Sequence, residues 1–242
     1  MEPYTAFSNV YDSVFKHVDY NQWYLYIRSI MLKYIEIPKR ILEIGCGTGK
    51  FGAKFSHDDF EIYGLDKSID MLKVAKLRAY NNFRIICGDM INFHFAKNFD
   101  FIFCVHDTIN YLLLPNEINQ VLGSVKGLMT EKSIFMFDIT SEYNVIKNFH
   151  GKVKKYHVNG IKIEWSNDYE KNKNLIYSTL KFQNKNGLAV TETHIQRVYS
   201  IEEMISIIKA NDFKIIDILG DYTFSPVKKN SVMINFITKR IY

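Results

Sequence analysis

Residues 41–52 have the sequence ILEIGCGTGKFG, and this stretch decides the fold class. Short apolar residues, typical of a buried parallel strand, are followed by glycines at alternate positions, Gly45, Gly47 and Gly49, and then by a run that is compatible with a helix. Glycine is needed where a backbone turns sharply or lies directly against a ligand, and the first N–H groups of a helix have no partner inside it. The stretch therefore predicts a strand, a turn and a helix that together hold a nucleotide-like cofactor.

Two cofactors fit these glycines. Starting at Gly47, the sequence GTGKFG fits the three-glycine pattern of dinucleotide-binding proteins, but this pattern begins late relative to the strand. Starting at Glu43, the sequence has the form acidic-x-Gly-x-Gly-x-Gly, which resembles motif I of the class I S-adenosylmethionine-dependent methyltransferases. The resemblance implies S-adenosylmethionine as the cofactor, and the rest of the chain has to distinguish it from a nicotinamide dinucleotide.

Composition indicates a folded protein. The 242 residues fit one α/β domain with an elaboration, and 47% hydrophobic residues are ample for a large core. No apolar run is long enough to span a bilayer, and the first residues lack the features of a signal peptide, so we expect a cytoplasmic protein. Cys46, Cys87 and Cys104 lie in or beside predicted core strands without metal-like spacing, so we expect buried free thiols and neither disulfides nor a metal site.

The charge balance is mildly basic. The chain has 31 Lys and Arg against 26 Asp and Glu, a net charge of +5, which at first suggests nucleic-acid binding. However, the lysines are scattered, and short basic groups such as that at 152–155 are no longer than ordinary solvated faces. A phosphate-binding surface would cluster its cations. We therefore disfavour nucleic acid as a partner and keep RNA, or another macromolecule, as an alternative acceptor.

The aromatic-rich segment 4–37 precedes the first strand, and its apolar residues recur at helical spacing. This pattern predicts one short and one longer amphipathic helix, which together form a helical cap. Tyr11 and Tyr20 each neighbour an aspartate near the junction of these helices. We expect the two tyrosines to close over the cofactor, where a hydroxyl can bind the methionyl carboxylate, and we expect the segment to become ordered when the ligand binds.

Acidic residues follow the next two strands. Residues 61–65 predict a second strand that leads to Asp66, at the place where the ribose hydroxyls of an adenosine cofactor lie. Residues 84–87 predict a third strand, and Asp89 and Met90 after it resemble the methyltransferase motif that binds the adenine amino group and packs on the ring. With motif I, the resemblance implies the cofactor-binding residues Tyr11, Tyr20, Glu43, Gly45, Cys46, Gly47, Gly49, Asp66, Lys67, Asp89, Met90 and Val105.

Residues 100–105 predict a fourth strand, whose continuous apolar run is typical of a parallel strand covered on both faces. The loop after it contains His106, Asp107, Asn110 and Tyr111. In open α/β sheets ligands bind at the carboxyl ends of the strands, where the strand order reverses, so we expect the reaction site in this loop. The Asp/Asn-Pro-Pro-aromatic element of enzymes that methylate nucleobase amino groups does not follow the strand, which argues against base methylation by that route.

After a fifth predicted strand at 133–138 and a helix at 141–149, the pattern changes. Three turn signals separate runs that are rich in β-branched and aromatic residues, and these signals lie at 158–161, 171–174 and 184–187. The region 151–199 is therefore predicted to be an inserted antiparallel sheet that serves as a lid or a substrate-binding wall.

The final strand of the inserted sheet carries polar side chains on one face. A two-residue period places Glu192, His194 and Gln196 on that face, and Arg197 on the opposite face. Such a polar face suggests the wall of a substrate pocket.

The C-terminal part supports the methyltransferase reading over the dinucleotide one. A helix at 200–211 is followed by two strands, at 214–219 and 232–240, which resemble the reversed final pair of the methyltransferase sheet. The resemblance implies a Rossmann-like α/β fold with a seven-stranded, mostly parallel sheet in the order 3-2-1-4-5-7-6. The expected regions are a helical cap at 1–37, a methyltransferase core at 38–150 and 200–242, and the inserted sheet at 151–199.

A finer resemblance narrows the function. The sequence HDTINYL after the fourth strand, the YD and VDY elements near the N-terminus and the later THIQRVYSIEEM together resemble a bacterial group of small class I methyltransferases, related to N-methyltransferases of amino sugars. We expect methyl transfer to a nitrogen or oxygen of a small molecule by a monomer or homodimer. The alternatives are methylation of RNA or another macromolecule, and a protein that binds S-adenosylmethionine without turnover.

Methyl transfer to an amine or a hydroxyl needs a group that accepts a proton. The candidate catalytic residues are His106, Asp107 and His194. The expected substrate residues are Asn110, Tyr111, Arg197 and Tyr222, the last from the loop between the final strands.

Overall fold

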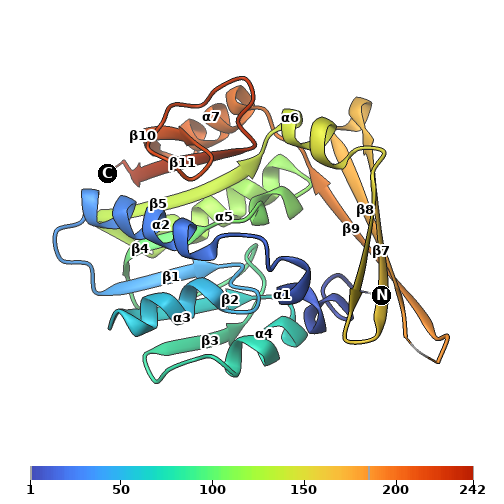
Figure 1. Ribbon diagram of the computed structural model, residues 1–242. Helices are drawn as coiled ribbons and strands as arrows, with labels where there is room; N and C mark the ends of the chain where they lie inside the picture. Colours follow the sequence, from blue (N-terminus) through green and yellow to red (C-terminus); the bar gives the residue numbers. More distant parts are fainter. Residues whose placement is uncertain (1, 185, 242) are drawn as a thin grey trace.

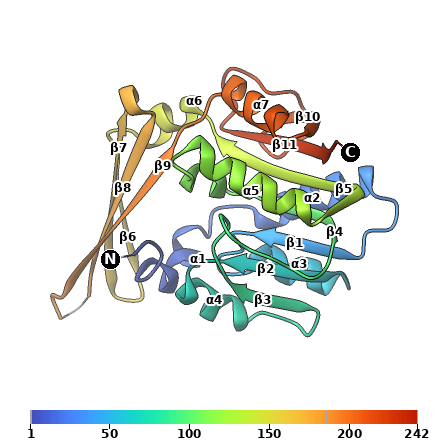
Figure 2. The same ribbon diagram turned by 180° about the vertical axis from the view of Figure 1, so that it is seen from behind.

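A computed structural model describes residues 2–184 and 186–241 (Figure 1). A seven-stranded sheet lies at its centre with helices on both faces, and a separate four-stranded sheet stands at one end (Figures 1 and 2). The central strands follow the order β3-β2-β1-β4-β5-β11-β10, and β11 runs antiparallel to both of its neighbours. The predicted Rossmann-like order with a reversed final strand is therefore confirmed.

The bounds of the elements are as follows. The central strands are β1 (Arg40–Ile44), β2 (Glu61–Asp66), β3 (Phe83–Cys87), β4 (Phe99–Cys104), β5 (Met129–Thr140), β10 (Phe213–Gly220) and β11 (Met233–Arg240). The inserted sheet comprises β6 (Val153–Val158), β7 (Ile161–Glu170), β8 (Leu175–Gln183) and β9 (Ala189–Arg197). The α-helices are α1 (Tyr11–Val14), α2 (Tyr20–Tyr34), α3 (Lys50–His57), α4 (Ile69–Lys76), α5 (Pro115–Gly127), α6 (Glu142–Asn144) and α7 (Ile201–Ala210). The short helices η1 (Phe7–Asn9), η2 (Thr108–Tyr111) and η4 (Lys171–Lys173) are 3₁₀, and η3 (Val145–Phe149) is a π-helical turn.

Two apolar layers hold the central sheet, one on each face. Phe101 and Phe103 of β4 point into the layer beneath α2 and α3, whereas Ile102 and Cys104 point into the layer beneath α5 and α7. Because a strand that is covered on both faces needs apolar side chains on both, β4 is a continuous apolar run from Phe101 to Cys104, after Asp100 near its start. In the described residues, no helix is both long and apolar enough to cross a membrane.

Three local predictions need correction. The predicted helix at 141–149 is a single α turn followed by the π-helical turn η3, and β5 extends beyond 133–138 in both directions. Cys46 and Cys104 are buried free thiols as predicted, but Cys87 is exposed. Its strand, β3, lies at the edge of the sheet, and an apolar strand sequence does not reveal this position.

The inserted sheet is antiparallel throughout, as predicted. The turn between β6 and β7 places Asn159 and Gly160 at positive φ, 53° and 80°, as a two-residue hairpin turn requires. The predicted turn at 171–174 joins β7 to β8. The third predicted turn, at 184–187, includes residue 185, which lies outside the described residues.

The N-terminal segment, defined here as residues 4–15, packs against the inserted sheet. Phe7, Val10 and Val14 form one apolar cluster with side chains of that sheet, among them Ile163 and Leu180. The segment therefore has its own apolar surface to bury against, in addition to any ligand. It joins the inserted sheet to the rest of the molecule (Figure 1).

The packing of α3 on the sheet can be tested at a glycine. A methyl group at Gly52 would overlap the phenyl ring of Phe83, so Gly52→Ala should lower the free energy of unfolding by about 1–3 kcal/mol, the usual cost of overpacking a core. Gly123→Ala in α5 is the matched control, because the space beside Gly123 is open and alanine should stabilise the helix by about 0.5–1 kcal/mol. Urea unfolding measures both changes, and shifts of the same sign and size would contradict this packing.

Candidate functional site

A large cavity of about 650 Å³ opens at the carboxyl ends of β1, β2 and β4. Cofactor sites typically have about 300–1,000 Å³, so the cavity has the right size for a nucleoside-containing ligand. The predicted cofactor residues that line it are Tyr11, Tyr20, Glu43, Gly45, Cys46, Gly47, Asp66, Lys67, Asp89, Met90 and Val105.

The glycine turn forms one side of the large cavity. Gly45, Gly47 and Gly49 have positive φ values of 72°, 53° and 74°, which glycine adopts without strain. The N–H of Gly45 donates to the carbonyl of Leu65 over 2.7 Å and so ties the turn to β2. Gly49 does not line the cavity, because it precedes α3 and packs against Ala75. Its glycine is needed for backbone conformation and packing.

Glu43 supplies an unpaired acceptor to the large cavity. Its exposed fraction is 2%, and its Oε2 atom has no hydrogen-bond partner among the described residues. Burial raises the pKa of Glu43 well above its usual value. Because buried polar atoms are nearly always paired, this oxygen is available to a hydrogen-bond donor of a ligand in the large cavity.

Two further carboxylates line the large cavity. Asp66 accepts the N–H groups of Gly47 and Ser68, each over 2.8 Å, and burial raises its pKa. Asp66 therefore connects the glycine turn to the start of α4, beside the place expected for the ribose. Asp89 accepts the N–H of Ile91 over 3.0 Å and pairs with the Lys67 ammonium at 2.9 Å.

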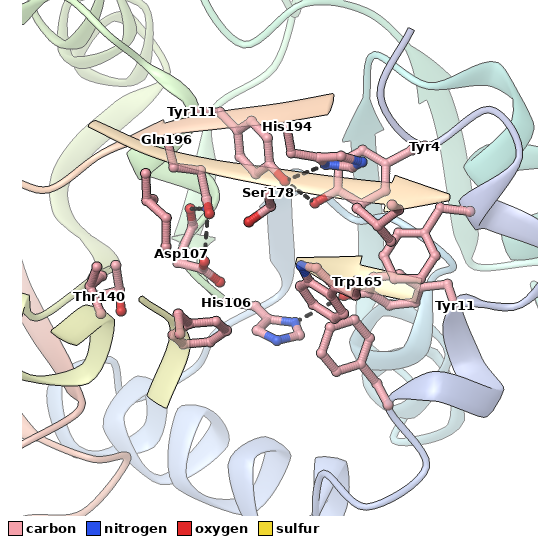
Figure 3. Close-up of a pocket in the computed structure, with 16 residues that line it drawn as sticks. Tyr4, Tyr11, His106, Asp107, Tyr111, Thr140, Trp165, Ser178, His194 and Gln196 are labelled. Carbon is pink, nitrogen blue, oxygen red and sulfur yellow. Dashed lines mark hydrogen bonds between the residues drawn. The ribbon is translucent and has the colours of Figure 1, made fainter. Parts of the chain in front are cut away.

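A small cavity of about 90 Å³ adjoins the large one, between the N-terminal segment, the loop after β4 and the inserted sheet (Figure 3). Its apolar lining is Phe7, Phe15, Val145, Phe149, Trp165, Ile176 and Leu180, and its polar lining includes Asp107, Thr140, Ser178, His194 and Gln196. Tyr4, Tyr11, His106 and Tyr111 line both cavities. We call these four residues the shared wall.

The loop after β4 is held in an unusual backbone conformation. His106 and Asp107 have positive φ values, 63° and 51°, which cost energy for residues other than glycine. The buried carboxylate of Asp138 accepts the N–H of His106 over 2.9 Å and that of Asp107 over 2.7 Å. It also accepts the hydroxyl of Tyr222. Burial raises the pKa of Asp138 to about 7.

Burial shifts the pKa values of the two loop side chains in opposite directions. It lowers the pKa of His106 to about 4, with a smaller contribution from the Lys50 ammonium, and it raises the pKa of Asp107 to about 6. The hydroxyl of Tyr11 lies 3.1 Å from Nδ1 of His106, and Nε2 of Gln196 donates to Oδ2 of Asp107 over 2.7 Å. At neutral pH the imidazole is therefore neutral, and the carboxylate can accept a proton.

A hydrogen-bonded chain crosses the shared wall. The hydroxyls of Tyr4 and Tyr111 are 2.6 Å apart, and the hydroxyl of Tyr111 is 2.9 Å from Nδ1 of His194 (Figure 3). Burial raises the pKa of Tyr4 and Tyr111 well above the usual value, so both are neutral phenols. Sequence reasoning selected Tyr111 and His194 but missed Tyr4, whose only signal was its place in an aromatic-rich segment.

Three predicted substrate residues lie outside both cavities. Asn110 is fully buried, and its side chain bonds the backbone of Arg197 and Thr140. Arg197 points to the Glu203 carboxylate at 2.7 Å, and Tyr222 bonds Asp138 behind the loop. Among the predicted substrate residues, Tyr111 alone lines a cavity.

Comparisons with known proteins indicate a methyltransferase domain. Residues 41–132 match the family model of a methyltransferase domain. The chain is 27% identical over 228 residues to the protein named "Putative methyltransferase YqeM" of Bacillus subtilis, and the match covers 91% of this chain and 90% of that protein.

Solved structures share the fold. An S-adenosylmethionine-dependent methyltransferase from Clostridium acetobutylicum superimposes with a TM-score of 0.85 at 24% identity, covering 98% of each chain. The sugar N-methyltransferase KedS8 from Streptoalloteichus superimposes with a TM-score of 0.76 at 14% identity, covering 94% of this chain and 92% of that one.

The large cavity is tested through Asp66. Asp66→Ala should weaken binding of S-adenosylhomocysteine by about 1.5–3 kcal/mol, the usual range for hydrogen bonds to a charged group. Asp168→Ala, whose side chain is 80% exposed on the inserted sheet, is the control and should leave the affinity unchanged. Calorimetry on both variants measures the effect. Binding of NAD in place of the methionine-derived ligands by the wild-type protein would overturn the assignment.

Proposed function

We propose that this class I S-adenosylmethionine-dependent methyltransferase methylates the amine nitrogen of a small molecule held in the small cavity. The observation that carries the proposal is the shared wall, the four residues at which a small cavity adjoins a cofactor-sized one. A cavity of about 90 Å³ accommodates a compact group and excludes a folded macromolecule. Methyl transfer from the large cavity to a group in the small one then needs no rearrangement of the central sheet.

The lining of the small cavity favours an amine. Aromatic rings attract cations through their faces, and a carboxylate binds an ammonium group strongly. Phe15 and Trp165 provide such rings, and Asp107 provides the carboxylate. The fold shared with a sugar N-methyltransferase supports the same choice.

The chain's own residues orient the reactants and take the proton. Bound S-adenosylmethionine supplies an electrophilic methyl group on its sulfonium sulfur. Holding two reactants in line contributes about 7–11 kcal/mol to lowering a barrier, and the shared wall together with Gln196 fixes this geometry. An acceptor that binds as an ammonium group first gives one proton to the Asp107 carboxylate, and the neutral amine nitrogen, with its lone pair free, then takes the methyl group. His106, with its pKa lowered to about 4 by burial, stays neutral during the reaction.

The proton acceptor is tested by pH dependence. With the pKa of Asp107 raised to about 6, its carboxylate becomes protonated below that pH, so kcat/KM should fall about tenfold per pH unit on the acid side. Asp107→Asn should lower kcat by about 10²–10⁴-fold and remove this acid limb, while Asp168→Asn should change neither. The assay is transfer of radiolabelled methyl to a panel of amino sugars and other compact amines. An acid limb that persists in Asp107→Asn would assign the proton to another group.

The two alternatives, a macromolecular acceptor and a binding protein without turnover, are tested by RNA binding and by the methyl-transfer assay. If several lysines contacted phosphates, RNA binding would weaken about 10³–10⁵-fold between low and moderate salt. We expect no saturable RNA binding at physiological salt, and a nanomolar complex with a defined RNA would favour a macromolecular acceptor. Failure to transfer methyl to any amine in the panel, or to any member of a matched panel of alcohols, despite tight cofactor binding, would favour a binding protein without turnover.

A further inference from the structure

We infer that Glu192 is a positioning residue that docks the start of the N-terminal segment and thereby places Tyr4 in the shared wall. Docking of the segment by Glu192 does not depend on the proposed function. The expected effect on acceptor binding does rest on the proposed function. Glu192 lies on β9 of the inserted sheet, does not line either cavity and is not among the groups assigned above to cofactor or acceptor.

The carboxylate of Glu192 is saturated by one short piece of backbone. Its side chain has an exposed fraction of 0%. Oε2 accepts the N–H of Tyr4 over 3.1 Å, and Oε1 accepts the N–H of Phe7 over 3.2 Å and that of Ala6. A buried carboxylate is costly unless donors surround it. Three donors from residues 4–7 therefore fasten this stretch to the inserted sheet through a single side chain.

The Glu192 carboxylate also contacts the hydrogen-bonded side chains that cross the shared wall. Oε2 of Glu192 lies 3.4 Å from Nε2 of His194, whose Nδ1 faces the hydroxyl of Tyr111. Tyr111 faces the hydroxyl of Tyr4, and the backbone of Tyr4 returns to Glu192. These four residues form a closed ring of contacts, so removing Tyr4 interrupts the ring at two places. Docking of the segment and the placement of His194 thus depend on one group.

A second attachment holds the other end of the N-terminal segment. Asp12 accepts from the guanidinium of Arg78 over 2.6 Å and from the hydroxyl of Thr48 over 2.8 Å, next to the glycine turn. The segment is therefore attached to the inserted sheet through Glu192 and the apolar cluster around Phe7, and to the central domain through Asp12. Loss of Glu192 should release residues 4–7 without releasing Asp12. Because Tyr4 lines both cavities and Thr5 lines the large one, this release should affect the cofactor side as well as the acceptor side.

The test combines hydrogen exchange with kinetics on the full chain. In Glu192→Gln, amides in peptides covering residues 2–9 should exchange about tenfold faster or more, and the KM for the acceptor should rise about 10- to 100-fold, as expected for losing hydrogen bonds to a charged group. Affinity for S-adenosylhomocysteine should fall as well, because Tyr4 and Thr5 line the large cavity. Glu164→Gln, on β7 of the same sheet and paired with Lys155, is the matched control and should change none of these.

Two further variants separate docking of the segment from the placement of the Tyr4 side chain. Ala6→Pro removes one donor from the backbone side, and the φ of −79° at Ala6 is close to the angle that a proline ring imposes. It should reproduce the faster exchange even if Glu192→Gln fails to fold. Tyr4→Phe leaves the backbone donors in place, so it should raise the KM for the acceptor without accelerating exchange.

Each result decides the inference. Unchanged exchange in residues 2–9 of both Glu192→Gln and Ala6→Pro would overturn docking by Glu192. Faster exchange with an unaltered acceptor KM would overturn its role in placing Tyr4. If the wild-type protein methylates no amine in the panel, the proposed function fails, and the exchange measurements still decide whether Glu192 docks the segment.

Discussion

The buried carboxylate of Asp138 is the group on which the site depends. It lies near the end of β5 and accepts the backbone N–H groups of His106 and Asp107, the two consecutive left-handed residues that follow β4. Each such residue costs about 1–3 kcal/mol, and hydrogen bonds to a charged group offset costs of that size. The reversed strand β11 contributes as well, because Asn235 pairs with Asp138 in the sheet and bonds the backbone of Tyr222, whose hydroxyl completes the carboxylate's donors.

Held in this way, the loop presents two titratable side chains to an aromatic enclosure, and burial reverses their usual order. An exposed imidazole is more basic than an exposed carboxylate. Here the pKa of His106 is lowered to about 4, and that of Asp107 is raised to about 6, in both cases chiefly because the charged form is desolvated. A proton released in the small cavity is therefore held more tightly by the carboxylate than by the imidazole.

Sequence patterns predicted the features that depend on residues close together in the chain. The strand, glycines and helix of residues 41–52 are contiguous. Asp66 ends β2 and Asp89 lies two residues after β3, so their places in the large cavity follow from the sheet order. Contacts across the chain left weaker signals. Tyr4 meets Tyr111 only because the N-terminal segment lies between the central domain and the inserted sheet.

The same limit explains the residues that sequence reasoning misplaced. Asn110 lies in the loop after β4, and Tyr222 lies behind that loop. The side chain of Asn110 turns away from the cavities to bond the backbone, and that of Tyr222 turns away to bond the Asp138 carboxylate. Arg197 ends a strand that lines the small cavity, but its guanidinium reaches forward along the chain to Glu203. Side-chain direction at the end of an element depends on the partners it meets there, and the two-residue period does not specify those partners.

The inserted sheet has an evolutionary consequence. Among the described residues, the lining of the large cavity contains none from β6 to β9, whereas β7, β8 and β9 all contribute to the small cavity, for example through Trp165, Ser178 and Gln196. The chain leaves the central sheet after β5 and returns at α7 (Figure 1). Substitutions at Trp165, Ser178 and Gln196 therefore alter the lining of the small cavity and replace no residue that lines the large one. Selection for substitutions in this part of the sheet can therefore change which acceptor molecules are bound while the residues that line the methyl-donor cavity stay the same.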